Sequence, residues 1–334
     1  MKYLFQRLIL TIPVLLGVSL IVFVIMHVIP GDPVQLIFSG TGASLEQREA
    51  MRHALGLDRP LPVQYANYVV NAVRGDLGRS IHFKQPVADL ILERMPATIE
   101  LTMAGLLIGL TMAFPAGIIS STKRNSMTDY LVMTGATLGI SLPTFWVGIL
   151  MILLVAVKLG WLPGFGRTGF EADLARVTGF YLVDSLLTGN IVAFKDAVSH
   201  LILPALTLGL SAATFTTRLV RSSMLEEIGK DYVRTARAKG VPERRVISHH
   251  VVRNALIPVI TLIGVMVGSL LGGAVVTETI FAWPGIGRLV IQAINTRDFP
   301  LVQGVVLFFA LINLTINFMI DVLYTLVDPR IRHV

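Results

Sequence analysis

The sequence predicts an all-α polytopic membrane protein with six transmembrane helices, both termini in the cytoplasm, and an extended outer segment after the first helix. Composition is the first reason: 54% of the 334 residues are apolar and only 15% are charged, with a mean hydropathy of +0.72. A soluble domain averages about 25% charged residues. So few charges cannot cover a water-facing surface of this size, which argues against a soluble enzyme.

Six apolar runs are the second reason. Each is long enough for a helix to cross the hydrocarbon core, which takes about 20 residues. The third run is long for a helix that crosses at a right angle, so we expect it to tilt or to break near Pro143. The runs are residues 8–30, 98–121, 130–159, 198–217, 255–277 and 301–327.

The distribution of basic residues predicts the orientation. The net charge is +7: with the N-terminus in the cytoplasm the inner segments carry +9, the outer segments −1, and residues within or at the ends of the spans −1. Because Lys and Arg accumulate on the cytoplasmic side of membrane proteins, both termini are predicted to be cytoplasmic. The positive charge therefore orients the chain and gives no reason to expect nucleic-acid binding.

The first outer segment, residues 31–97, carries helix signals of its own. Ser44 and Gln47 have the spacing of a capping box, and Gly56 ends the helix that follows. Residues 63–73 and 87–95 have apolar side chains at helical spacing. We therefore expect three short amphipathic helices here. The chain then divides into residues 1–30 (N-terminus and first span), 31–97 (outer helical segment) and 98–334 (five-helix core).

Within the core, the basic segment 218–254 is predicted to be cytoplasmic. A helix of two to three turns is predicted between Gly229 and Gly240, and Pro242 starts the next helix. A short helix held between turns suits docking into a groove on another protein. A positively charged loop lying on anionic membrane lipid is the alternative. The helix and its cap are Asp231, Tyr232, Val233, Arg234, Thr235, Ala236, Arg237, Ala238, Lys239 and Gly240.

Prolines and polar residues inside the spans are candidates for a pathway or a gate, because polar groups are costly in a membrane and prolines free backbone carbonyls. The structural alternatives are helix ends for the prolines, interhelical hydrogen bonds for two asparagines, and a pair with Arg7 for an aspartate. Glu100 and Glu278 lie at outer span ends, where a carboxylate costs little. The candidates are Pro143, Pro204, Pro258, Asn313, Asn317 and Asp321.

Several chemistries are excluded. The chain has no cysteine, no G-x-x-x-x-G-K-[ST] phosphate loop, and neither H-E-x-x-H nor G-x-S-x-G, so no catalytic residue is predicted. His249 and His250 diverge by about 100° on a helix and have no third ligand nearby, so no metal site is predicted. Residues 264–272 hold three glycines at four-residue spacing, which favours close helix packing.

Residues 234–240 resemble the coupling-helix signature of bacterial ABC importer permeases. The chain is most similar to the dipeptide, oligopeptide and nickel branch, and to the first of its two permease subunits. Arg234, Thr235 and Arg253 depart from the broader importer signature, which puts in doubt any contacts carried over from sugar or amino-acid importers. The motifs that carry the resemblance are residues 30–33, 55–61, 75–78, 222–225, 231–232, 234–240, 253–255 with Pro258, 278–281, 283–288, 297–300 and 328–332.

The resemblance implies a permease in the bacterial inner membrane that pairs with a second homologous permease, two ATPase subunits and an external binding protein. The ATPases would bind ATP and Mg, and this chain would bind no cofactor and would not be an enzyme. The helix at residues 231–240 would carry ATPase motion to the spans. Peptides are the expected substrate, with nickel chelates, glutathione or opines as alternatives; a secondary transporter or channel is a distant alternative.

The outer face is expected to receive the binding protein. Its size and its helix signals exceed what a tether between spans requires. Two parts of this face carry the hypothesis, the capping box and the turn between the last two spans. The proposed docking residues are Ser44, Gln47, Trp283, Pro284 and Gly285.

Overall fold

The computed structural model describes residues 2–28, 34, 38, 44–54, 56–169 and 174–327. In these residues the regular elements are helices, joined by loops and one isolated β-bridge between Arg79 and Pro86. The chain forms two compact units, Met1–Pro96 with Gly285–Val334, and Ala97–Pro284.

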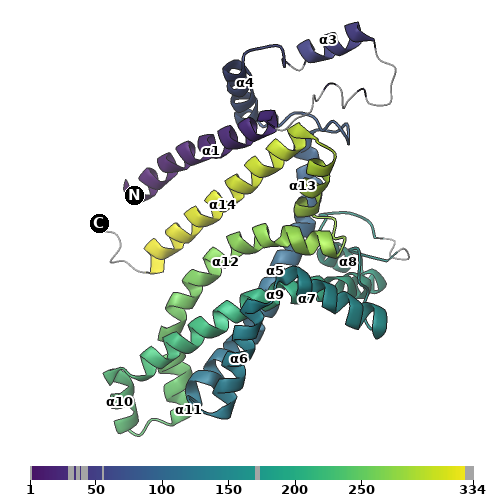
Figure 1. Cartoon of the computed structure of the whole chain (residues 1–334). Coiled ribbons are helices and arrows are strands. Elements are labelled where there is room, and N and C mark those ends of the chain that lie inside the picture. Colours follow the sequence, from purple (N-terminus) through teal and green to yellow (C-terminus); the bar gives the residue numbers. More distant parts are fainter. Residues whose placement is uncertain are drawn as a thin grey trace. The chain divides into compact units, whose positions relative to one another are not determined.

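The first unit is built on α1 and α14, which pack side by side and run in opposite directions (Figure 1). The start of α1 and the end of α14 therefore lie at the same end of the pair, as an even number of membrane crossings requires. Helix α4 packs on α1, and α13 packs on α14. The helices of this unit are α1 (Lys2–Val28), α3 (Leu45–Ala54), α4 (Leu61–Val73), the start of α5 (Val87–Thr122), α13 (Ile286–Asn295) and α14 (Phe299–Val327).

The second unit is arranged around the long helix α9, which packs against α6, α7, α8 and α12 (Figure 1). The short helices α10 and α11 lie at one end of α9. The described helices of this unit are the rest of α5 (from residue 97 on), α6 (Met127–Ser141), α7 (Thr144–Met151), the π-helix η1 (Ile152–Lys158), α8 (Tyr181–Leu187), α9 (Ile191–Ile228), α10 (Asp231–Ala238), α11 (Glu243–Arg245), the π-helix η2 (Val246–Val251) and α12 (Val252–Ile280).

Four of these helices, α1, α5, α9 and α14, are individually long and apolar enough to cross a membrane. Two further spans arise if each bent pair of helices counts as one. One pair, Met127–Ser141 with Thr144–Lys158, bends by 101°. Pro143 lies at that bend, which confirms the break predicted there. The other pair, Glu243–Ile260 with Leu262–Gly272, bends by 41° shortly after Pro258.

Two of the three expected outer helices form as predicted. The capping box of α3 is present, since the Ser44 amide donates to Gln47 Oε1 at 3.0 Å and the Gln47 amide donates to Ser44 Oγ at 3.3 Å. Helix α4 covers the second expected helix. The third is wrong as a separate element, because residues 87–95 are the first turns of α5. Pro86 precedes this helix, which continues through Pro96 without a break.

Glycines bring α5 and α9 into close contact. A Cβ added to Gly109 would lie 2.8 Å from Ala212 Cβ, and one added to Gly117 would lie 2.7 Å from Val220 Cβ. Such distances leave no room for a methyl group. Gly105 and Gly109 form a small-xxx-small pair, as membrane helices use for close approach. By contrast, a Cβ on Gly272, in the pattern singled out above, would meet nothing within 4 Å.

Gly109→Ala tests this packing, with Gly135→Ala as its matched control. A Cβ on Gly135, which is exposed on α6, would meet nothing within 4 Å. We expect Gly109→Ala to lower the free energy of unfolding by about 1–3 kcal/mol, the usual cost of overpacking. Gly135→Ala should leave it unchanged or raise it by up to about 1 kcal/mol through helix propensity. Unfolding of the purified protein in detergent measures both, and equal effects would contradict close packing at Gly109.

Candidate functional site: the α10 segment

Helix α10 is a short helix fixed at its C-terminal end by a Schellman motif. Gly240, with φ +75°, donates its N–H to the Arg237 carbonyl at 3.0 Å, and the Val241 N–H donates to the Ala236 carbonyl at 3.3 Å. Glycine adopts this left-handed conformation without the steric cost that a Cβ brings. The predicted helix, its Gly240 cap and the helical restart after Pro242 are therefore all present.

The inner face of α10 is anchored in an apolar cluster. Val233 is fully buried and Ala236 is 9% exposed. They pack against residues from α9, η2 and α12, so the helix is tied to both long spans of this unit. The other buried members of the cluster are Val220, Met224, Val246, Val251, Ala255 and Val259.

Hydrogen bonds around Tyr232 reinforce this anchor. Its hydroxyl donates to Glu227 Oε2 at 2.6 Å, and Asn254 Nδ2 donates to the Tyr232 oxygen at 3.1 Å. Burial raises the pKa of Tyr232, and contact with Glu227 adds to the rise, so the hydroxyl keeps its proton at neutral pH. Lys230 pairs with the same Glu227. Residues from α9, α10 and α12 thus meet at one phenol.

The outer face of α10 is exposed and basic. Arg234, Arg237 and Lys239 are all exposed. Arg237 forms a two-pronged pair with Glu243 of α11, Nε to Oε2 at 3.0 Å and Nη2 to Oε1 at 2.7 Å. The hydrogen bond to Glu243 raises the pKa of Arg237. The pair closes the turn between the two helices, while Arg234 makes a longer contact of 3.5 Å with Asp231.

A buried ion pair joins α6 to α9 in the same unit. Asp129 is 3% exposed and accepts from Arg221 Nε and Nη2, both at 2.8 Å. It also accepts from the Ser120 hydroxyl and, at 3.0 Å, from the Asn125 amide. This clasp, three residues before Met224 of the apolar cluster, was not predicted. The Ser126 N-cap of α6, which accepts from the Asp129 amide, was the local signal available.

A second buried polar network in this unit joins α5 to Arg167 and to the end of α12. Arg167 Nη2 pairs with Glu100 Oε2 at 2.6 Å, and the Arg167 guanidinium lies 3.7 Å from the centre of the Tyr181 ring. Thr98 Oγ1 donates to Glu278 Oε1 at 2.7 Å. Glu100 and Glu278 are both buried. The expectation that a carboxylate costs little at these positions near the membrane interface is therefore wrong, because each carboxylate is buried away from water and held by a hydrogen-bonding partner.

Asp184 organises the loop that precedes α8. Its carboxylate accepts from the Val177, Thr178 and Gly179 amides at 2.8–3.2 Å, and from the Thr178 hydroxyl at 2.6 Å. Burial alone would raise the pKa of Asp184. The hydrogen bonds to Thr178, Gly179 and Val177 outweigh this effect and leave the pKa below its usual range. The carboxylate therefore stays ionised at neutral pH and holds the loop in place.

The proposed docking residues differ in their accessibility. Ser44 and Gln47 are exposed, and Pro284 is partly exposed. Trp283 is only 1% exposed, because its ring packs in the core and its Nε1 donates to the Ala97 carbonyl at 2.8 Å. Gly285 is buried as well. Trp283 and Gly285 therefore present little surface to a docked protein, and the docking role of the five residues stays a prediction.

The candidate pathway residues are spread along the helices. Pro143 separates α6 from α7, whereas Pro204 and Pro258 lie inside α9 and α12, so helix termination does not explain these two. Asn313 donates to the Phe309 carbonyl of its own helix at 3.3 Å. Asn317 is exposed. The side chain of Asp321 lies outside the described residues.

Metal chemistry has no support in the described part of the chain, where no group of three His, Asp or Glu side chains is placed to hold an ion. The α10 segment instead has the form of a mechanical contact for another protein. It presents an exposed basic face on a helix that is fixed to the long helices behind it.

Comparison with known proteins decides the family. Residues 96–333 match the family model described as the binding-protein-dependent transport system inner membrane component, and residues 1–102 match its N-terminal counterpart. The chain belongs to this family. This permease is therefore a multi-pass inner-membrane subunit of an ABC importer.

Relatives match this permease over their full lengths. It is 46% identical to the di/tripeptide transport system permease protein DppB of Pseudomonas aeruginosa, over 100% of this chain and 99% of that protein. It is 43% identical to the dipeptide permease DppB of Escherichia coli K12, with the same coverage. It is 41% identical to the glutathione transport system permease protein GsiC of Escherichia coli O6:H1, again with the same coverage.

A solved structure shows the same fold. The inward-facing MetNI methionine ABC transporter matches with a TM-score of 0.55, at 17% identity, over 72% of this chain and 96% of that one.

The Asp129–Arg221 clasp can be tested by a double-mutant cycle. Arg221→Gln leaves a buried carboxylate without its cation and should lower the free energy of unfolding by up to about 3 kcal/mol. Adding Asp129→Asn removes the stranded charge, so the double variant should recover much of that loss. Denaturant unfolding of the four proteins gives the coupling energy. A coupling energy near zero would contradict the clasp.

Proposed function

We propose that this permease imports dipeptides and short oligopeptides, and that it forms half of a pathway whose other half is a second homologous permease. The substrates named for DppB of two species support peptides. GsiC, at 41% identity, favours glutathione as the second candidate. Glutathione is itself a short modified peptide, so both candidates belong to one chemical class.

We further propose that two ATPase subunits bind beneath α10 and that they hold the ATP and Mg. The sequence has no phosphate loop of its own. The observation that carries this proposal is the geometry of α10. Its Val233 and Ala236 are locked into α9, η2 and α12, and its basic face stays exposed. A helix held this way can pass a push from a bound ATPase to the spans.

The remaining assignments concern the two sides of the membrane. The excess of basic residues in the predicted inner segments supports an orientation with both termini in the cytoplasm. With that orientation α3 belongs to the outer face, and its exposed Ser44 and Gln47 support docking of an external substrate-binding protein there. The three-part division at residues 30 and 97 stays a prediction.

The coupling role is tested by charge changes on α10. Arg234→Glu with Arg237→Glu should lower uptake of a labelled dipeptide by about tenfold, which corresponds to about 1.4 kcal/mol, because the basic face no longer matches the ATPase. Uptake and stimulated ATP hydrolysis are measured on the assembled transporter in proteoliposomes.

Glu243→Gln is the matched control. It breaks the same internal pair with Arg237 but leaves the basic face intact, so uptake should stay within about twofold of the parent. Full transport by the double Arg variant, or an equal loss in Glu243→Gln, would overturn the coupling role. Uptake of glutathione in place of dipeptides by the parent protein would reassign the substrate alone.

A further inference from the structure

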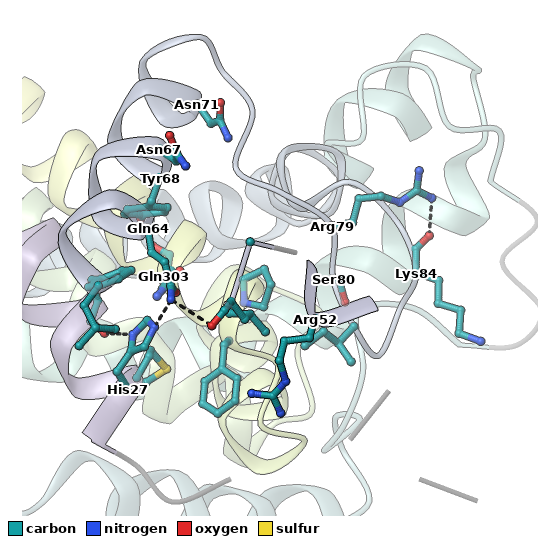
Figure 2. Close-up of a pocket in the computed structure, with 18 residues that line it drawn as sticks. His27, Arg52, Gln64, Asn67, Tyr68, Asn71, Arg79, Ser80, Lys84 and Gln303 are labelled. Carbon is teal, nitrogen blue, oxygen red and sulfur yellow. Dashed lines mark hydrogen bonds between the residues drawn. The ribbon is translucent and has the colours of Figure 1, made fainter. Parts of the chain in front are cut away.

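The first unit contains a cavity of about 870 Å³ at the end of α1 (Figure 2). Residues from α1, α3, α4, the loop at residues 79–84 and the start of α14 line it. Sites for small molecules have volumes of about 300–1,000 Å³, so this cavity has the size of a binding site. The proposed import function makes no use of it.

The formally charged side chains that line the cavity are all basic. Arg52, Arg79 and Lys84 line it, and none of its described lining residues carries a carboxylate. Figure 2 shows Arg79 and Lys84 on one side of the cavity and His27 and Gln64 on the other. Such a lining favours an anionic group, and Arg and Lys are the usual partners of phosphate.

The loop that carries Arg79 and Lys84 is held in place from behind. Asp298, which is fully buried, accepts from the Ser80 hydroxyl and, at 3.0 Å, from the His82 amide. Arg79 Nη2 donates to the Lys84 carbonyl at 2.8 Å, which fixes the two residues relative to each other. The carboxylate of Asp298 thus anchors the loop that places Arg79 and Lys84 in the lining of the cavity.

An apolar groove of about 430 Å³ adjoins this cavity, and Tyr68 of α4 lines both. The groove runs between α1, α4 and α14 and is lined almost entirely by apolar side chains. Ile12, Leu16 and Leu311 in its walls are 57%, 42% and 49% exposed. These side chains belong to helices long and apolar enough to cross the membrane, so the groove opens toward lipid.

Cavity and groove lie in the same spatial order along α1 and α14, although these two helices run in opposite directions. On α1 the cavity residues are Phe23–His27 and the groove residues are Ile12–Ser19; on α14 they are Phe299–Gln303 and then Leu307–Leu311. From residue 27 to residue 12 a helix rises about 22 Å. One leaflet together with its headgroup region is about 20–22 Å deep, half the thickness of the bilayer. The site therefore has the polarity profile and the depth of one leaflet.

We propose that the cavity and the groove together bind one anionic phospholipid, with its phosphate at Arg79 and Lys84 and an acyl chain between α1, α4 and α14. A soluble anion would use the cavity and leave the groove empty. A second protein chain would cover the groove but has no need of three cations beside it. An anionic lipid uses both, and it is already present where the groove opens. The proposal is the same for either leaflet that this end of α1 faces.

The test uses the assembled transporter in nanodiscs that contain either phosphatidylglycerol or phosphatidylcholine, each with a diazirine in its acyl chain. After illumination, mass spectrometry should find labels on residues 12–19 and 307–311, several-fold more with phosphatidylglycerol. Arg79→Gln with Lys84→Gln should lower this labelling by about thirtyfold, since two basic side chains near an anionic headgroup contribute about 1 kcal/mol each. Lys158→Gln with Lys195→Gln removes the same charge from exposed positions of the other unit and should leave the labelling unchanged.

Ala72→Trp provides an independent variant, because it fills the groove and leaves the cations in place. It should abolish the acyl labels. Equal labelling by the two lipids, or labelling that survives the Arg79 and Lys84 changes, would overturn the proposal. So would cross-linking of residues 12–19 to the second permease in place of lipid. If a variant fails to fold, competition on the parent protein decides, since unlabelled phosphatidylglycerol must displace the probe far better than phosphatidylcholine.

Discussion

The burial of Val233 and Ala236 between α9, η2 and α12 is the contact on which the proposed coupling mechanism depends. An isolated helix of eight residues is not stable in water, because it pays the cost of nucleation for very few hydrogen bonds. Here tertiary packing supplies the stability that length cannot. The Schellman motif at Gly240 and the bonds of Tyr232 then fix the orientation of the helix. Because the apolar face of α10 is packed against α9, η2 and α12, the opposite, basic face is the one that stays exposed.

Under the proposed coupling, movement at α10 would reach the spans through α9. This helix has 38 residues and is about 57 Å long, so one continuous helix, with Pro204 inside it, runs from the α10 segment to the turn that follows α8. Close-packed interiors transmit displacement with little loss. Gly109 and Gly117 let α5 approach α9 without intervening side chains, and the Asp129–Arg221 clasp adds α6. The two helices α5 and α6 are therefore attached to α9, so under the proposed coupling a displacement of α10 would reach both.

The sequence is sufficient to predict local features of this fold. Gly240, Pro143 and the Ser44–Gln47 box each act within a few residues, and each forms the turn, bend or cap expected from those residues alone. The pairs that hold helices together could not be predicted. Asp129 and Arg221 are 92 positions apart, and Glu100 and Arg167 are 67 apart. The burial of Trp283 could not be predicted for the same reason, since its ring lies in a core cluster built from residues of α5, α9 and α12.

The central claim is that α10 moves together with α9 as one body, and a distance measurement tests it most directly. The chain has no cysteine of its own, so spin labels at Ser222→Cys on α9 and Lys239→Cys after α10 report a single pair when the partner subunits are cysteine-free. Both positions are exposed. We expect double electron–electron resonance to give one narrow distance between the two labels, and this distance should not change when ATP and the binding protein are added. A distance that shifts or broadens with ATP would show that α10 moves independently of α9 and would contradict the claim.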